Sequence, residues 1–187
     1  MKYKFHILLL LVLAVACTPN QRPERKPLAD TSFDKAYSRN YGAHYLTRGI
    51  EQNVIDLDLY SGNLGLDSAN HIVGTGTNLY LSDIFIPASE NKLHDAEGEE
   101  LIFASDTTGA EYTFLPGVDY DGNISGAYLL NITEGNLTSY TVFDEGSFTV
   151  NHAADTTRIH FVFKYTQSSV RLTYEADFCG VIEYDRK

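Results

Sequence analysis

The side chains of this chain best suited to catalysis are its acids, because 25 of its 187 residues are Asp or Glu. A glycosidase needs only two carboxyl groups, about 5 to 10 Å apart across a cleft, one of them acting as a general acid. The fold brings two such carboxyl groups together, so their spacing in the sequence does not reveal them. The acids therefore leave a small two-carboxylate hydrolase open as a function but identify no catalytic residue.

One acidic segment has the alternating oxygen side chains of a calcium loop. It reads Asp119-Tyr120-Asp121-Gly122-Asn123. An EF-hand needs glycine at its sixth position and glutamate at its twelfth, but counting from Asp119 these positions hold Ile124 and Leu130. We interpret the segment as a polar hairpin turn, since Asp, Gly and Asn are the residues that turns require.

Other patterns of catalysis or cofactor binding are missing from the sequence. The six histidines are scattered, no pair has the spacing of a helical zinc site, and there is no Cys-x-x-Cys. The Gly-x-Ser-x-Gly motif of serine hydrolases and a phosphate-binding glycine loop are also absent. We therefore predict no metal and no cofactor, and we expect a protein without catalytic activity.

A short apolar segment near the N-terminus ends at a cysteine. Two positive charges, Lys2 and Lys4, precede an uninterrupted apolar run from Ile7 to Ala16, which is typical of a secretory signal. A membrane-spanning helix needs about 20 apolar residues, so this run is too short to be a stable span. The alternative to lipidation at this site is an ordinary signal peptide followed by a coincidental cysteine.

The residues Leu13-Ala14-Val15-Ala16-Cys17 resemble the bacterial lipobox. In that motif the cysteine is linked to diacylglycerol and becomes the mature N-terminus. The resemblance implies that residues 1–16 are a signal peptide and that Cys17 carries lipid. It also implies a cell-envelope protein anchored in a membrane, most often the outer membrane, with its periplasmic or surface face left open.

Composition divides the remaining chain into a tether and one domain. Residues 17–32 contain Pro19, Pro23 and Pro27 among polar residues, which is typical of an extended linker. Residues 33–187 have the size of a single domain. Removal of Lys2 and Lys4 would change the net charge from −11 to −13. Such acidity makes nucleic acid an unlikely partner, so the expected partners are the membrane, through its lipid anchor, and a glycan or an envelope protein.

Strict alternation of apolar and polar residues dominates the domain. It is clearest at 52–60, 78–86, 157–165 and 170–176, where every second residue is apolar. Shorter strands are predicted at 101–104, 111–115 and 126–132, and 139–143 and 147–151 are predicted to form a hairpin around Asp144-Glu145-Gly146. The pattern predicts an all-β fold, an antiparallel β-sandwich, with a closed lipocalin-like β-barrel as the alternative.

The last fifty residues also resemble a family. The strands containing Gly146-Ser147-Phe148, Ile159-His160-Phe161 and Leu172-Thr173-Tyr174 look like the C-terminal meander of small β-sandwich lipoproteins of gut Bacteroidales. The activity of that family is unsettled, so the resemblance implies no functional residue. Ser68, Thr107 and Thr156 lie in Asp-Ser/Thr-small triplets that resemble the sites O-glycosylated on exported Bacteroidales proteins, although a turn role explains the triplets equally well.

Three functions fit these observations. The first is a non-catalytic envelope lipoprotein whose sandwich binds a glycan or a protein through its loops. The second is a structural or assembly subunit held by an edge strand, and the third is the two-carboxylate hydrolase. We further expect Cys179, between Phe178 and Val181, to be an unpaired and buried thiol, because acylation would consume the sulfur of Cys17.

The lipidation of Cys17 leads to a direct test. The substitution Cys17→Ser should move the processed protein from the detergent phase to the aqueous phase, because the acyl chains supply the membrane affinity. Phase partitioning followed by mass measurement checks this, with uncleaved precursor scored separately. A processed Cys17→Ser protein that still partitions with membranes would contradict the lipobox interpretation.

Overall fold

The structure, a computed structural model, describes residues 28–29, 31–69, 71–104 and 108–184. The signal peptide, Cys17, most of the tether and Thr107 lie outside these ranges, so the predictions made for them stay predictions. Within the described ranges the chain is built of β-strands, and its only helices are two 3-10 turns. The all-β prediction is confirmed.

The strands alternate with short turns along the whole domain. In chain order they are β1 (Thr31–Phe33), β2 (Lys35–Gly42), β3 (Asn53–Tyr60), β4 (Gly65–Leu66), β5 (Ile72–Val73), β6 (Gly76–Ile86), β7 (Glu100–Phe103), β8 (Thr113–Phe114), β9 (Val118–Tyr120), β10 (Asn123–Ser125), β11 (Ala127–Thr133), β12 (Asn136–Val142), β13 (Glu145–Ala153), β14 (Thr156–Gln167), β15 (Val170–Gly180) and β16 (Ile182–Tyr184). The two 3-10 turns are η1 (Leu46–Arg48) and η2 (Leu93–Ala96).

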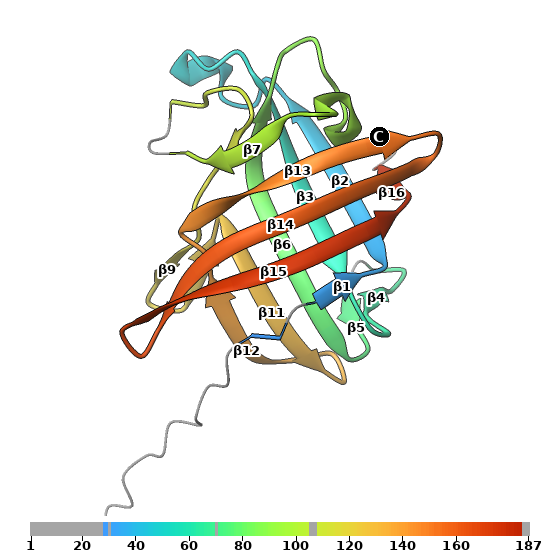
Figure 1. The fold of residues 1–187 in the computed structure, drawn as a ribbon, viewed down its shortest axis with the longest axis vertical. Helices are drawn as coiled ribbons and strands as arrows, with labels where there is room; N and C mark the ends of the chain where they lie inside the picture. Colours follow the sequence, from blue (N-terminus) through green and yellow to red (C-terminus); the bar gives the residue numbers. More distant parts are fainter. Residues whose placement is uncertain (1–27, 30, 70, 105–107, 185–187) are drawn as a thin grey trace, which may run out of the picture.

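Twelve of the described strands form one curled sheet. Its order is β1-β15-β14-β13-β7-β8-β6-β3-β2-β16, with β11 and β12 branching from β6. Figure 1 shows β13, β14 and β15 crossing in front of β2, β3, β6 and β11, so one sheet supplies both faces around the core. Two separate ribbons, β4–β5 and β9–β10, lie outside this sheet.

The sheet is mixed, where the sequence predicted antiparallel pairing throughout. Most neighbours are antiparallel, but β1 pairs with β15, β2 with β16, and β7 with β8 in parallel. Only Asp34 separates β1 from β2, and only Val181 separates β15 from β16. The first and last segments of the domain therefore run side by side in parallel, and we call this pairing the terminal seam.

At β8, by contrast, the sheet is connected by very few residue pairs. The strands β6 and β8 share the single residue pair Phe85↔Thr113, and β7 and β8 share two. The turn η2 packs nearby, with Leu93 and Ala96 fully buried. The sheet is therefore curled around its core but is not a clearly closed barrel.

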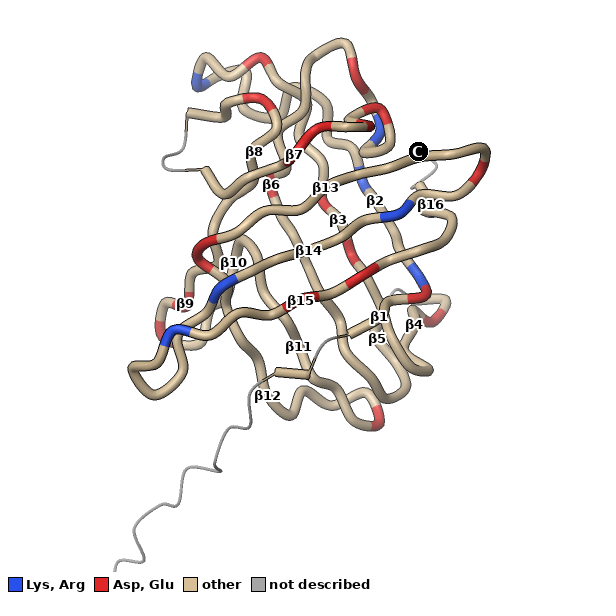
Figure 2. Tube along the Cα trace, in the orientation of Figure 1, with Lys and Arg blue, Asp and Glu red and all other residues tan. Residues whose placement is uncertain are grey.

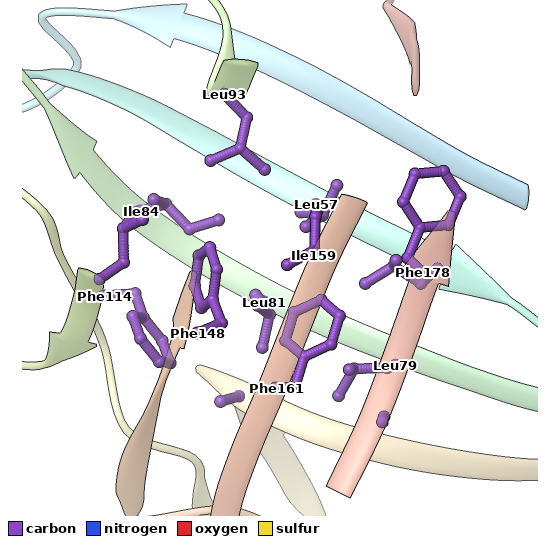
Figure 3. Packing of buried hydrophobic residues seen from close by; sticks show 14 of the residues in the cluster. Leu57, Leu79, Leu81, Ile84, Leu93, Phe114, Phe148, Ile159, Phe161 and Phe178 are labelled. Carbon is purple, nitrogen blue, oxygen red and sulfur yellow. The ribbon is translucent and has the colours of Figure 1, made fainter. Parts of the chain in front are cut away.

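Alternation of side chains fills the space between the two faces. From β14, Ile159, Phe161 and Phe163 point inward and are at most 1% exposed. They meet aliphatic side chains of β3 and β6, and Figure 3 shows the ring of Phe161 close to Leu79 and Leu81. The inward and outward faces predicted for β3, β6 and β14 are confirmed, and burial of these apolar surfaces is the main favourable contribution to folding.

The predicted hairpin around Asp144-Glu145-Gly146 is wrong. The strand β12 pairs with β11, whereas β13 pairs with β14 and β7. The chain instead turns at Asp144, and Glu145 and Gly146 are already the first residues of β13, paired with Lys164 and Phe163 of β14. Gly146 has φ of +134°, and a Cβ there would collide with the carbonyl oxygen of Val162. The turn residues at this position do mark a change of direction, but the two strands that they join do not pair with each other.

Cys179 is a free thiol in the described part of the chain, but the prediction that it is buried is wrong. Phe178 points into the core with 1% exposure, so its neighbour on the strand faces outward, and Cys179 is exposed. The alternation of inward and outward residues along β15 sets this orientation. The apolar residues near Cys179 had suggested burial, because the prediction rested on composition and not on the face of the strand. No helix among the described residues has the length and apolar character needed to cross a membrane.

The core can be tested at Phe161. The substitution Phe161→Ala should lower the free energy of unfolding by about 3 to 5 kcal/mol, since it removes a fully buried ring and leaves a cavity. Urea denaturation measures this, with Thr173→Ala, an exposed position on β15, as the control expected to stay within about 0.5 kcal/mol of the wild type. A loss below about 1 kcal/mol would contradict the assigned packing.

Candidate functional site

The outward face of β2, β3, β6 and β11 carries a row of tyrosines around an acid. The pairing register places Tyr37, Asp58, Tyr80 and Tyr128 opposite one another on these four strands. Because residues paired across neighbouring strands project on the same side of a sheet, these four side chains share one surface. Asp56 and Tyr60 extend this surface along β3, two residues before and after Asp58.

A groove of about 510 Å³ lies over this row, and we call it the tyrosine–aspartate groove. Its lining residues are Tyr37, Ser38, Arg39, Tyr41, Asp56, Asp58, Tyr60, Leu66, Ile72, Asn78, Tyr80, Tyr128 and Leu130. Leu66 and Ile72 come from the β4–β5 ribbon. A small cluster of Tyr60, Leu64 and Ile132, joined by Ile72, packs this ribbon against the sheet. The ribbon therefore forms a wall and turns a flat sheet face into a groove.

A β-bulge fixes the acids at the centre of the groove. Ile55 pairs with Ile84 and Leu57 with Leu81, so Asp56 faces both Ser82 and Asp83 on β6. Asp83 has φ of +53°, which is uncommon for a residue with a side chain. Its backbone N–H donates to Asp56 Oδ1 at 3.1 Å, and Tyr80 Oη donates to Asp56 Oδ2 at 2.5 Å. Both oxygens of Asp56 are thus held in place, which orients the ring of Tyr80.

Asp58 lies partly buried in the floor of the groove. Its pKa is raised from 3.8 to about 6, mainly by burial and also by the nearby charge of Asp56, while hydrogen bonds from Asn78 and Tyr60 act in the opposite direction. Asn78 Nδ2 donates to Asp58 Oδ1 at 3.2 Å. The Asp58 carboxyl group is therefore harder to ionise than an exposed one, and it lies in contact with an amide and a phenol.

The aromatic rings of the groove are arranged in pairs. The Tyr80 and Tyr128 rings are 5.1 Å apart and inclined by 33°, and the Tyr37 and Tyr60 rings meet edge to face at 5.6 Å. Burial, with the acids nearby, raises the pKa of Tyr128 to about 12 and also raises that of Tyr80. The phenols therefore stay protonated, and they offer ring faces and hydroxyl groups side by side.

This arrangement is better suited to binding than to bond cleavage. Asp56 and Asp58 stand on one strand, about 7 Å apart along it, whereas glycosidase carboxyl groups flank the scissile bond from opposite sides. Both oxygens of Asp56 already accept hydrogen bonds from the protein. A ligand would find a Tyr-lined surface with Asp58 and Arg39 as polar groups, and no pair of acids facing each other across the groove.

The other predicted sites are distributed elsewhere. The segment 119–123 forms the β9–β10 hairpin, as expected, with Asp121 and Gly122 in the turn and Gly122 donating its N–H to Asp119 Oδ1 at 2.9 Å. Ser68 is exposed in the β4–β5 loop and Thr156 begins β14. The structure does not test their glycosylation. Cys17 and Thr107 lie outside the described residues.

Two histidines that are distant in sequence lie together in the structure. The His94 and His152 rings stack at 4.5 Å, and His94 Nδ1 is 3.1 Å from Tyr184 Oη. Burial lowers the pKa of His94, which favours its neutral form beside a second imidazole. Among the described residues, no group of three or more His, Cys, Asp or Glu side chains is placed to hold a metal ion.

Comparison with known proteins adds no relative. No family model matches the chain, and no curated protein or solved structure is significantly similar to it. The tyrosine–aspartate groove must therefore be interpreted from its own chemistry.

Part of this site could be read from the sequence. The alternation of β3 and β6 placed Asp56, Asp58 and Tyr80 on the outward face, and that placement is confirmed. Tyr37 and Tyr128 were not singled out, because only the pairing of β2 and β11 with β3 and β6 brings them beside the acids. The bulge at Asp83 had no recognisable sequence signal.

The environment of Asp58 predicts a pH-dependent stability. Its pKa in the folded chain, about 6, lies above the ordinary 3.8, so the folded state binds the proton more tightly. This contribution to stability is fully present below about pH 4 and is lost as the pH rises through about 6. The variant Asp58→Asn cannot ionise, so its stability relative to the wild type should rise by roughly 2 to 3 kcal/mol between about pH 4 and about pH 8.

Urea denaturation of both proteins across this pH range measures the effect. Asp121→Asn, at an exposed turn position with positive φ, is the matched control and should show a much smaller change. An Asp58→Asn curve parallel to that of the wild type at all pH values would show that Asp58 is well hydrated and would contradict the described burial.

Proposed function

We propose that this protein is a non-catalytic, lipid-anchored envelope protein that binds a glycan in the tyrosine–aspartate groove. The observation that carries the proposal is the set of tyrosines paired in register around Asp58 on an outward sheet face. A sheet face with a wall, and not a set of loops, is then the binding surface.

Sugar rings have apolar faces of C–H groups and a rim of hydroxyls, and the groove offers a partner to each. Tyr80 and Tyr128 present ring surface on neighbouring strands, and aromatic rings contribute contact area at small cost in conformational entropy. Asp58 and Arg39 supply hydrogen-bonding groups beside them. A volume of about 510 Å³ lies in the range of small-molecule sites.

The acids of the groove also indicate which glycans to expect. Asp56 and Asp58 line the groove together with one cation, Arg39, and the whole chain has a net charge of −11. A glycan with carboxylate or sulfate groups would meet like charges, whose juxtaposition in a partly desolvated site is unfavourable. The proposed ligands are therefore neutral oligosaccharides.

The location of the protein is part of the same proposal. The lipobox resemblance at Cys17 supports anchoring in the cell envelope, most often at the outer membrane, and the tether would give the domain reach from the lipid surface. A lipid-anchored protein with a glycan site would hold its ligand close to the membrane.

A two-carboxylate hydrolase is the second candidate, and one observation favours it. The pKa of about 6 for Asp58 would suit a general acid at neutral pH. A hydrolase would release new reducing ends from an oligosaccharide, and Asp58→Asn would abolish that release while Tyr120→Phe would not. Binding without any release of reducing ends supports the first candidate over this one.

The binding function is tested by substitutions at the rim of the groove. The variant Tyr128→Ala should weaken the affinity for neutral oligosaccharides by roughly tenfold, since about 1 to 1.5 kcal/mol of ring contact is lost. Titration calorimetry with neutral gluco-, xylo-, manno- and chito-oligosaccharides measures the affinity, alongside a uronate oligomer expected to bind weakly or not at all.

The matched control is Tyr120→Ala. Tyr120 is 79% exposed on the β9–β10 ribbon and does not line the groove. Its loss should leave the affinity unchanged. The function would be wrong if no neutral oligosaccharide bound, or if both variants reduced binding equally.

A further inference from the structure

Two histidine rings stack at one end of the core, although they come from different parts of the chain. His94 belongs to η2, and His152 stands on the inward side of β13, two residues beyond the buried Val150. The ring centroids are 4.5 Å apart and the ring planes are inclined by 19°. Two neutral imidazoles pack well at this distance, but two protonated ones would repel each other. We call this pair the histidine stack.

The neighbours of His94 fit a neutral ring. Tyr184 Oη lies 3.1 Å from Nδ1 of His94, and Asp95 Oδ1 lies 3.3 Å from Nε2. Burial raises the pKa of Tyr184 to about 12, so the phenol keeps its proton and can donate it to Nδ1. Lys92 Nζ lies over the same phenol ring, 5.1 Å from its centre. A His94 ring with its own hydrogen on Nε2 satisfies both neighbours, and a second proton on Nδ1 would displace the one that Tyr184 donates.

The charges described around the histidine stack leave a second imidazolium unbalanced. Burial has the largest effect on His94 and lowers its pKa, and the nearby Asp95 carboxylate raises it. The positive charges of Lys92 and of a protonated His152 lower that pKa as well. From the strand side, the neutral Thr157 hydroxyl lies 2.9 Å from Nδ1 of His152. Figure 2 shows basic and acidic positions close together beside β13 at this end of the sheet, but one carboxylate faces two imidazoles and an ammonium group among the described neighbours of His94.

The turn η2 covers one end of the core with two apolar side chains. Leu93 and Ala96 are fully buried, and Figure 3 shows Leu93 pointing toward Leu57 and Ile159. After the turn, the Gly98 N–H donates to a backbone carbonyl of β13 at 3.0 Å. Because a 3-10 turn of four residues has little stability of its own, its position depends on these contacts and on the histidine stack beside them.

We propose that the histidine stack is an acid-sensitive latch, and that protonation of both rings separates them and releases η2 from the end of the core. The pKa of His94 is lowered in the folded chain, so acid favours states in which its ring is released. The closed latch therefore loses stability as the pH falls below about 6.5, the ordinary pKa of histidine. This device goes beyond glycan binding, because neither histidine lines the tyrosine–aspartate groove.

Release of η2 would uncover apolar surface without breaking the sheet. The pairing of β13 with β14 and that of β16 with β2 do not involve η2, so these strands can stay paired while Leu57 and Ile159 come into contact with water. The pH dependence is opposite in sign to that of Asp58, whose contribution to stability is present at low pH. Substitutions at the histidine stack therefore separate the two effects.

Hydrogen exchange read by mass spectrometry tests the latch on the purified full-length protein. Protection of the backbone amides of residues 93–98 should be at least about tenfold lower at about pH 5 than at about pH 7.5, after correction for intrinsic exchange rates. The amides of β14 should stay protected at both pH values, because the sheet remains formed. Nuclear magnetic resonance of the two imidazole rings should show a titration over the same pH range, and raising the pH should reverse both changes.

Two substitutions of His152 separate its charge from its other contacts. His152→Phe keeps an aromatic ring against His94 but cannot be protonated, so protection of residues 93–98 should change by less than about twofold between the two pH values. His152→Gln keeps a hydrogen-bonding group for Thr157 and should lose the acid response in the same way. The matched control is His160→Gln on β14, where an exposed histidine lies 2.8 Å from an aspartate, and this variant should respond to acid like the wild type.

Equal protection of residues 93–98 at both pH values in the wild type would overturn the proposal. An acid response that persists in both His152 variants would do the same, as would one that disappears on removal of the charged residues 185–187, because other groups would then drive it. Loss of protection throughout the sheet at about pH 5 would show general acid unfolding and would also exclude the latch. Glycan binding measured at neutral pH is unaffected by any of these results, so the two proposals fail separately.

Discussion

The parallel pairing between the beginning and the end of the domain holds the fold together. At the terminal seam β1 lies along β15, and β2 lies along β16. Phe33 and Phe178 are paired across this seam and are both 1% exposed. Without the seam the curled sheet would have two open edges over its apolar interior, and the aromatic side chains of β14 and β15 would face water.

The candidate site results from the way this sheet departs from regular pairing. The bulge opposite Asp56 turns Asp83 so that its N–H reaches a carboxylate, and the β4–β5 ribbon covers part of the outer face. Regular strands of equal length would have produced a smooth surface, so the irregularities carry the chemistry here, as bulges often do near functional sites.

The sequence predicted what depends on neighbouring residues and missed what depends on distant ones. The two-residue period oriented Asp58, Tyr80 and Phe161 correctly, because burial of one sheet face imposes that period. The partners of each strand are set by contacts far apart in the chain, and the hairpin expected at 144–146 failed for that reason. Cys179 shows the same limit, since its apolar neighbours suggested burial while its position on β15 placed it outside. The groove joins four strands and could not be assembled from any one of them.

The terminal seam also determines when the domain can finish folding. Its pairs join Ala36 to Ile182 and Phe33 to Phe178, so the sheet lacks its last strand until residues 182–184 have been made. A chain dominated by such distant contacts folds slowly, because the entropy of closing a long loop must be overcome first. During synthesis, the sheet of this domain therefore stays open along β1 and β2 until β15 and β16 have been made. Late closure would also delay the tyrosine–aspartate groove, because β2 and β3 supply part of its lining.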